Sequence, residues 1–329
     1  MDFRRITLAA TRLRTLAWSG DDLVDWVMGR RYKLDGTTEH VNVGNAYRFD
    51  ASTGCDAYAV KYENFGTKGV VMRDTGLRDA RGGHRLDFLR EIDRRVYHAD
   101  AYCFPALLFR AFDGRVLLAH CPREYKALDL ETPEGECLTP RPVEDASDVF
   151  HSRLDASLDG RWLLSNGWVW HPWGVACVYD VARALAEPAY LSTDGERIDL
   201  GDDFEGDVQG AAFAGERLVC ITAEDGPALS VFDLRTREVE LCAKLDEAPG
   251  TRLMALDDDH VALFDGHPRV LQLSTGKVVE RWDDLDGGRS LYQPSTRQKP
   301  VEPPHLACDP ANGRFALGYA DRIVVVSRV

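Results

Sequence analysis

The chain has 329 residues, of which 44% are hydrophobic and 29% are charged; this composition is that of a folded globular protein and excludes a disordered chain. Acidic residues outnumber basic ones by 54 to 40, and the resulting net charge of −14 makes nucleic acids and anionic membrane surfaces poor partners. Apolar runs stay well short of the roughly 18 residues that a membrane-spanning helix needs.

The start of the chain and its cysteines bear on the compartment. Arg4 and Arg5 are not followed by a long apolar stretch, so we expect no signal peptide. The eight cysteines are spread along the chain without a Cys-x-x-Cys pair. Some lie in apolar segments, such as Cys177, where a reduced cysteine acts as a small buried hydrophobe. Both observations predict a cytoplasmic protein.

A pattern of four short segments recurs with a period of roughly 40–50 residues. Each copy has two apolar segments joined by a turn, often Asp-Gly, then a third segment that ends in Asp, and a polar turn into a fourth. The clearest copy has segments at residues 152–156, 161–165 and 175–181. Other copies begin near residues 13, 63, 106, 210 and 252. Four short strands per repeat predict the blades of a β-propeller.

The last copy is incomplete. It offers three strands, at residues 305–308, 314–318 and 322–326, while residues 3–8 form a spare strand ahead of the first full copy. Pairing the spare strand with the last copy closes a ring and removes two exposed sheet edges. We therefore expect one all-β domain over residues 1–329. It is a seven-bladed β-propeller with four-stranded blades, the last of which is shared between the two ends.

The end of the third segment carries a family resemblance. An aromatic or aliphatic residue and Asp precede a turn that often contains Thr, as in Phe49-Asp50, Leu128-Asp129, Tyr179-Asp180 and Phe232-Asp233. This resembles the end of the third strand in WD40 and related bacterial propeller repeats of the YVTN type. The resemblance spans nearly the whole chain and implies a ring with a central channel and a binding role. It carries over no catalytic residue.

Helix signals are few. Residues 181–186, directly after Asp180, are expected to form one or two helical turns. Residues 139–142 and 287–304 contain several prolines. We interpret both as long inter-blade loops, because the repeat resumes after each.

The most unusual segment is residues 166–174, which we place in a loop between two strands of one blade. It contains Trp168, Trp170, His171 and Trp173. Large rigid aromatic side chains dominate binding at protein interfaces, so these four residues are the predicted binding anchor. The structural alternative is that the tryptophans cap the blade core.

A second segment, residues 97–102, carries His98 and Asp100. On a strand, alternation would put His98, Asp100 and Tyr102 on one face. If they face the central channel, His98 and Asp100 could perform general acid–base catalysis. The structural alternative is a hydrogen bond between blades.

The sequence lacks a phosphate-binding loop, a dinucleotide fingerprint, a serine-hydrolase elbow and closely spaced histidine ligands. We expect no cofactor and no metal, and we read the acidic clusters at residues 199–207, 257–259 and 283–286 as solvated loop tips. The preferred interpretation is a non-catalytic scaffold or binding module for a protein partner, which the net charge predicts to be basic. The alternative is a propeller enzyme, a lyase or hydrolase, acting at the channel mouth.

Overall fold

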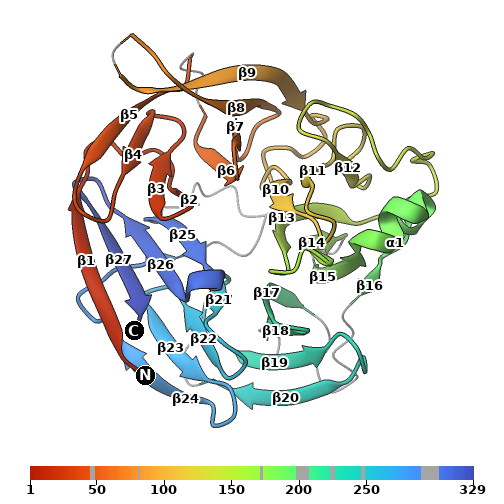
Figure 1. Ribbon diagram of the computed structural model, residues 1–329. Coiled ribbons are helices and arrows are strands. Elements are labelled where there is room, and N and C mark those ends of the chain that lie inside the picture. The colour runs from red at the N-terminus through yellow and green to blue at the C-terminus, as the bar shows by residue number, and fades with distance from the viewer. Residues whose placement is uncertain are drawn as a thin grey trace.

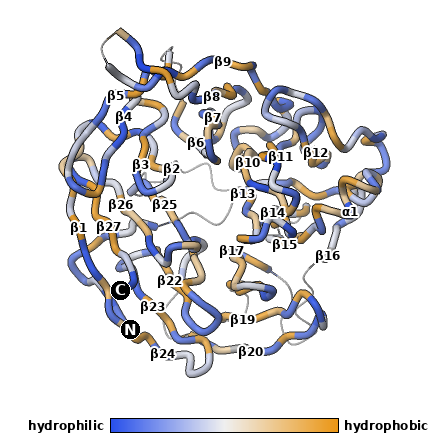
Figure 2. The backbone as a smooth tube through the Cα atoms, viewed as in Figure 1, coloured by the Kyte–Doolittle hydropathy of each residue, from blue (hydrophilic) through white to orange (hydrophobic). Residues whose placement is uncertain are grey.

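A computed structural model describes residues 1–44, 49–80, 82–170, 173–197, 207–222, 227–245, 249–289 and 304–329. The described part is almost entirely β-structure, with one α-helix and two short 3-10 helices. The strands form six sheets arranged around a centre like the blades of a propeller (Figure 1). Hydrophobic residues run along the strands, and many turns are hydrophilic (Figure 2). The prediction of an all-β, propeller-like fold with few helices is confirmed.

Five of the six sheets are separate blades with three or four antiparallel strands. The smallest consists of β10 (Ala106–Arg110), β11 (Val116–His120) and β12 (Asp129–Glu131). The next consists of β13 (Phe150–Ala156), β14 (Trp162–Val169), β15 (Trp173–Asp180) and β16 (Glu196–Arg197). Another consists of β17 (Val208–Ala214), β18 (Arg217–Thr222), β19 (Ala228–Asp233) and β20 (Val239–Lys244). A fourth consists of β21 (Leu253–Ala255), β22 (His260–Leu263), β23 (Arg269–Gln272) and β24 (Lys277–Arg281).

The fifth blade joins the two ends of the chain. Its strands are β25 (His305–Asp309), β26 (Arg314–Gly318), β27 (Arg322–Arg328) and, beside β27, β1 (Phe3–Ala9). The register of β1 on β27 runs from Phe3↔Arg328 to Ala9↔Arg322. The predicted pairing of the spare strand with the last three strands is therefore confirmed.

The sixth sheet has eight strands and differs from the prediction of separate four-stranded blades. One half is β2 (Ala17–Ser19), β3 (Asp22–Asp25), β4 (Arg30–Tyr32) and β5 (Thr38–Asn42). The other half is β6 (Ala51–Cys55), β7 (Tyr58–Tyr62), β8 (Lys68–Arg78) and β9 (His84–Asp93). The halves join because β8 and β9 form a long hairpin whose outer part reaches β5, where Val41 and Asn42 pair in parallel with His84 and Arg85.

Asp-Gly turns join strands as the repeat predicts. Between β13 and β14, Gly160 has a φ of +66°, in the left-handed region that suits glycine. A Cβ at this position would lie 2.1 Å from the carbonyl oxygen of Arg110 in the preceding blade. Glycine is thus required both by the turn and by the close approach of two blades.

The hydrophobic core lies between neighbouring blades. Alternate residues of one strand face opposite neighbours: Leu117 of β11 belongs to a cluster with Leu163 of β14, whereas Leu118 belongs to a cluster with Val71 of β8. The middle strands of the blades are therefore buried on both faces, which explains their nearly continuous apolar runs.

The predicted helix is present as α1 (Val181–Ala186). The Asp180 carboxylate caps it by accepting a hydrogen bond of 3.0 Å from the Arg183 backbone N–H, and Val181 and Ala184 pack into the core. The 3-10 helices are η1 (Pro188–Ser192) and η2 (Pro310–Asn312). The described residues contain no helix with the length and apolar character to cross a bilayer.

Candidate functional site

The two segments singled out in the sequence meet in the structure. Residues 97–102 and the end of β14 converge on Phe150, the first residue of β13. The seven rings in mutual contact, called the aromatic cluster below, are Tyr97, His98, Tyr102, Tyr125, Phe150, Trp168 and Trp170. The structure thus brings together His98, Trp168 and Trp170, which the sequence analysis treated as parts of two separate sites.

Strand direction explains why these residues meet. β10 and β11 are antiparallel, so the start of β10, which follows the β9–β10 connection, and the end of β11 lie at the same end of this blade. Tyr97 lies in the β9–β10 connection and Tyr125 in the β11–β12 turn, while Phe150 opens β13 and Trp170 follows β14. In an antiparallel meander these positions all lie at one end of the strands. The aromatic cluster therefore occupies one face of three consecutive groups of strands.

Phe150 is the centre of a stack of three rings. Its ring centroid lies 3.9 Å from that of Trp168, with an interplanar angle of 11°, and 4.1 Å from that of Tyr125, with an angle of 20°. Trp170 stands perpendicular to Phe150, at 89° and 5.4 Å. His98 packs edge-on against Trp170 at 5.4 Å and against Tyr97 at 4.5 Å. Stacked and edge-to-face pairs of this kind each add stability beyond the area they bury.

The aromatic cluster has a buried base and an exposed rim. Phe150, Trp168 and Tyr102 are buried, whereas Tyr97 and Trp170 are 46% and 43% exposed. His98, between the two exposed rings, is also exposed. Large rings held rigidly from below and open to solvent above can contact a partner at little further cost in side-chain entropy.

The backbone at His98 corrects a prediction. Residues 97–100 form turns and not a strand, with N–H groups of Ala99 and Ala101 donating to the carbonyls of Val96 and His98. His98 has a φ of +50°, which is strained for a residue with a Cβ. The expected alternation of His98, Asp100 and Tyr102 on one strand face is therefore wrong. Among the described residues, no hydrogen bond or ion pair joins His98 to Asp100.

Arg94 holds the loop that carries Tyr97 and His98. Only 5% exposed, its guanidinium donates to five backbone carbonyls, those of Asn64, Gly66, Ala99, Tyr102 and Cys103, at 2.6–3.5 Å. It also lies 4.4 Å from the centroid of the Tyr102 ring, within cation–π range. Burial lowers the pKa of Arg94, and the five carbonyls compensate for the lost hydration.

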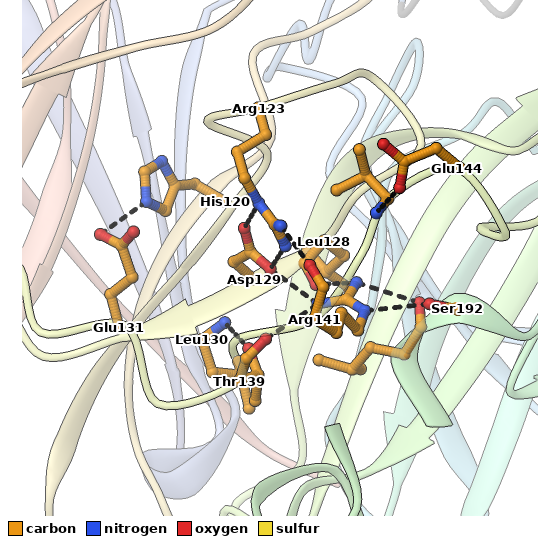
Figure 3. Close-up of polar contacts among 12 residues, drawn as sticks. His120, Arg123, Leu128, Asp129, Leu130, Glu131, Thr139, Arg141, Glu144 and Ser192 are labelled. Carbon is orange, nitrogen blue, oxygen red and sulfur yellow. Dashed lines mark hydrogen bonds and ion pairs between the residues drawn. The ribbon is translucent and has the colours of Figure 1, made fainter. Parts of the chain in front are cut away.

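A second buried network holds the segments that carry Tyr125 and Phe150 (Figure 3). Asp129, at the start of β12, accepts hydrogen bonds of 2.7–2.8 Å from Arg123 and Arg141. Arg141 also donates to the carbonyls of Leu128, Thr139 and Leu191 and to Ser192 Oγ. The network thereby ties the β11–β12 turn to the segment that leads into β13.

Trp173, the third tryptophan of the predicted anchor, lies outside the aromatic cluster. Trp173 is 37% exposed on β15 and makes no ring contact with a described aromatic residue. His171 lies outside the described residues. The expected loop at residues 166–174 is also largely strand, because β14 extends to Val169 and β15 begins at Trp173. Gly167 permits this extension, since a Cβ there would lie 2.3 Å from the carbonyl oxygen of Phe150.

Several charged residues lie near members of the aromatic cluster in the sequence. Asp100 and Asp148 are exposed, and the Tyr125 hydroxyl donates to Asp148 Oδ1. Burial and this carboxylate raise the pKa of Tyr125, so its hydroxyl remains a donor. The nearby cations Arg95 and Lys126 donate to backbone carbonyls of Arg123 and Glu144.

Three of the described histidines lie in three separate blades. His120 Nε2 lies 2.9 Å from Glu131 Oε2 in one blade, His151 Nδ1 lies 3.0 Å from Ser165 Oγ in the next, and His260 faces Asp257 in a third. The pKa of His151 falls to about 4, mainly because of burial and secondarily because of the Arg141 charge. Among the described residues no three metal-binding side chains come together.

Neither a family model nor a curated protein sequence matches this chain. The functional argument therefore rests on the chain's own residues.

Proposed function

We propose that the protein is a non-catalytic binding module that docks a protein partner on the aromatic cluster. The observation that carries this proposal is the exposed rim of Tyr97, His98 and Trp170 on a buried, stacked base. Aromatic anchors that are rigid before binding and become desolvated on binding contribute most to interface affinity.

The partner that this surface favours is basic. The chain carries a net charge of −14, and the exposed Asp148 carboxylate accepts a hydrogen bond from the hydroxyl of Tyr125, a member of the aromatic cluster. A positive potential on the partner would raise its association rate with such a surface. Arginine or lysine side chains can also lie over aromatic rings, as Arg94 lies over Tyr102 from the inner side.

We further propose seven blades of the WD40-like kind, with each half of the eight-stranded sheet counted as one blade. Support comes from the core, where seven hydrophobic clusters each link two consecutive groups of strands. One cluster links the two halves of the large sheet through Val24 and Ala59, and another links β27 with β3 through Ile323 and Leu23. A crystal structure of the intact chain with a blade count other than seven would overturn this part.

Substitution of one exposed tryptophan tests the binding proposal. We expect Trp170→Ala to reduce recovery of a specific partner from lysate of the host cells roughly tenfold or more, since it removes an exposed anchor. Trp173→Ala is the matched control, because Trp173 is similarly exposed but lies outside the aromatic cluster. Quantitative mass spectrometry of the material captured by each form provides the measurement.

The partner's charge is tested in the same capture. A basic partner should be released as the salt concentration rises, because exposed charges are screened.

The two tryptophan variants also define the outcome that contradicts the proposal. If Trp170→Ala and Trp173→Ala reduce recovery of the partner equally, or if neither reduces it, the binding surface lies elsewhere.

A further inference from the structure

A pocket of about 410 Å³ lies between two neighbouring blades, far along the chain from the aromatic cluster. One wall comes from the end of β20 and the other from the sheet β22–β24. Its lining residues are Lys244, Leu245, Leu263, Arg269, Leu271, Gly276, Lys277, Val278 and Arg281. Its volume lies in the range of pockets that hold small organic ligands, roughly 300–1,000 Å³.

The charge of the lining is opposite to that of the chain. Four of the nine lining residues are lysine or arginine and none is acidic, although acidic residues exceed basic ones by 14 in the whole sequence. Arg269 of β23 and Arg281 of β24 lie directly opposite each other in the antiparallel register. Like charges in this position repel each other, and the ion pair of Arg281 with Asp283 offsets part of this repulsion.

An irregularity in β24 brings its side chains to the same side. The register shifts where Leu271 pairs with Val278 and Val270 pairs with Glu280, leaving Val279 as an extra residue. An extra residue reverses the alternation of a strand beyond it. Val278 and Arg281 both line the pocket for this reason, although their odd spacing would place them on opposite faces of a regular strand.

The cations differ in how they are held. Arg269 is buried and donates to the carbonyls of Asp265 and His267, and Arg281 bonds Asp283 at 2.6 Å. Lys244 and Lys277 are exposed, and the side-chain ammonium group of neither makes a hydrogen bond or ion pair in the part of the chain that the structure describes. The two lysines are therefore available to contact a bound anion.

We propose that this pocket binds a small amphiphilic anion, a carboxylate or phosphate group on a short aliphatic chain. Lys244 and Lys277 contact the anionic group as mobile ammonium donors, and the two arginines supply a fixed positive field. Leu245, Leu263, Leu271 and Val278 form the apolar part of the lining, where an aliphatic chain replaces water. This site is independent of the aromatic cluster and of the proposed protein partner.

Calorimetric titration of the intact protein at low salt tests the proposal. Octanoate represents the carboxylate source, octyl phosphate represents the phosphate source, and inorganic phosphate lacks the aliphatic chain. We expect at least one amphiphile to bind with 1:1 stoichiometry and at least tenfold more tightly than inorganic phosphate. The variant Lys244→Gln/Lys277→Gln should weaken that binding at least tenfold. The control Lys68→Gln, an exposed lysine paired with Asp93 in another blade, should leave it unchanged.

Each outcome of the titration either supports or overturns the proposed anion site. Binding of octanoate or octyl phosphate that the double variant weakens supports the site and identifies the head group. Failure of both amphiphiles to bind, or equal binding by the wild type and the double variant, overturns it. Inorganic phosphate binding as tightly as octyl phosphate also overturns it, because the lysines then hold an adventitious ion only.

Discussion

At the scale of single residues, two buried arginines determine the shape of the candidate binding surface. Arg94 donates to three carbonyls of the loop that carries Tyr97 and His98 and to two carbonyls of the β7–β8 turn, and Arg141 connects Asp129 with the segment that leads to Phe150. Loops have few hydrophobic contacts of their own. A guanidinium with five fixed donors substitutes for such contacts by satisfying several backbone groups at once.

Replacement of Arg94 should therefore be costly. Arg94→Ala leaves buried carbonyls without donors, and we expect a loss of about 3 kcal/mol or more in the free energy of unfolding. Urea denaturation followed by tryptophan fluorescence measures it. Arg95→Ala is the control, because Arg95 is exposed and donates to a single carbonyl; its effect should stay within about 0.5 kcal/mol. Similar losses in both variants would mean that Arg94 does not organise the loop.

His151 should make the protein sensitive to mild acid. Its folded-state pKa is about 4 because of burial, whereas an unfolded histidine titrates near 6.5. Between these two pH values the histidine takes up a proton in the unfolded chain but not in the folded chain. The free energy of unfolding is therefore highest above pH 6.5 and decreases by about 3 kcal/mol in total as the pH falls toward 4.

The variant His151→Gln keeps a polar partner for Ser165 but cannot take up the proton. We expect its urea midpoint to change less between pH 7 and pH 4.5 than that of the wild type. An identical pH dependence in the two proteins would exclude His151 as its source.

At the scale of elements, the pairing of β1 with β27 covers an edge that otherwise lies open. A chain that lacks residues 2–9 should expose β27 and self-associate through that edge. Size-exclusion chromatography measures this, and a synthetic peptide of residues 1–10 should restore the monomer by taking the place of β1. A scrambled peptide of the same composition should not. Monomeric behaviour without any peptide would show that the edge is already protected.

Local patterns explain which elements the sequence could predict. Short apolar segments and Asp-Gly turns mark the strands of the clearer repeats, and Asp180 before a short helix-forming segment marks α1. The parallel pairing of β5 with β9 joins edges that belong to different repeats, and no local pattern encodes that contact. The extension of β14 to Val169 was missed for a related reason, since it depends on the fit of Gly167 against Phe150.

The candidate site was predicted only in part. Trp168, Trp170 and His98 were chosen because their segments have unusual composition, whereas Phe150, at the centre of the stack, lies in an ordinary strand. The only indication in the sequence was its position, because Phe150 begins a strand at the end of the blades where residues 97–102 and the end of β14 also lie. The buried arginines had no such signal, because a charged residue in a loop is usually exposed.

At the scale of the whole molecule, the two proposed sites use separate parts of the ring. The aromatic cluster lies between β9 and β14, and the anion pocket lies between β20 and β24. Each core cluster links only neighbouring groups of strands, so substitutions at the two sites should act additively on stability. The two proposed partners, a basic protein and a small anion, carry opposite charges.

The pairing of β1 with β27 also affects the order in which the protein can fold during synthesis. Ala9 pairs with Arg322, so β1 leaves the ribosome roughly 15–60 s before its partner strand at synthesis rates of about 5–20 residues per second. Throughout that interval its backbone donors and acceptors are unpaired, and any strand of a neighbouring nascent chain can occupy them. The exposed arginines Arg4 and Arg5 give β1 a positive charge. Repulsion between these charges opposes pairing of β1 strands from different nascent chains until β27 is made.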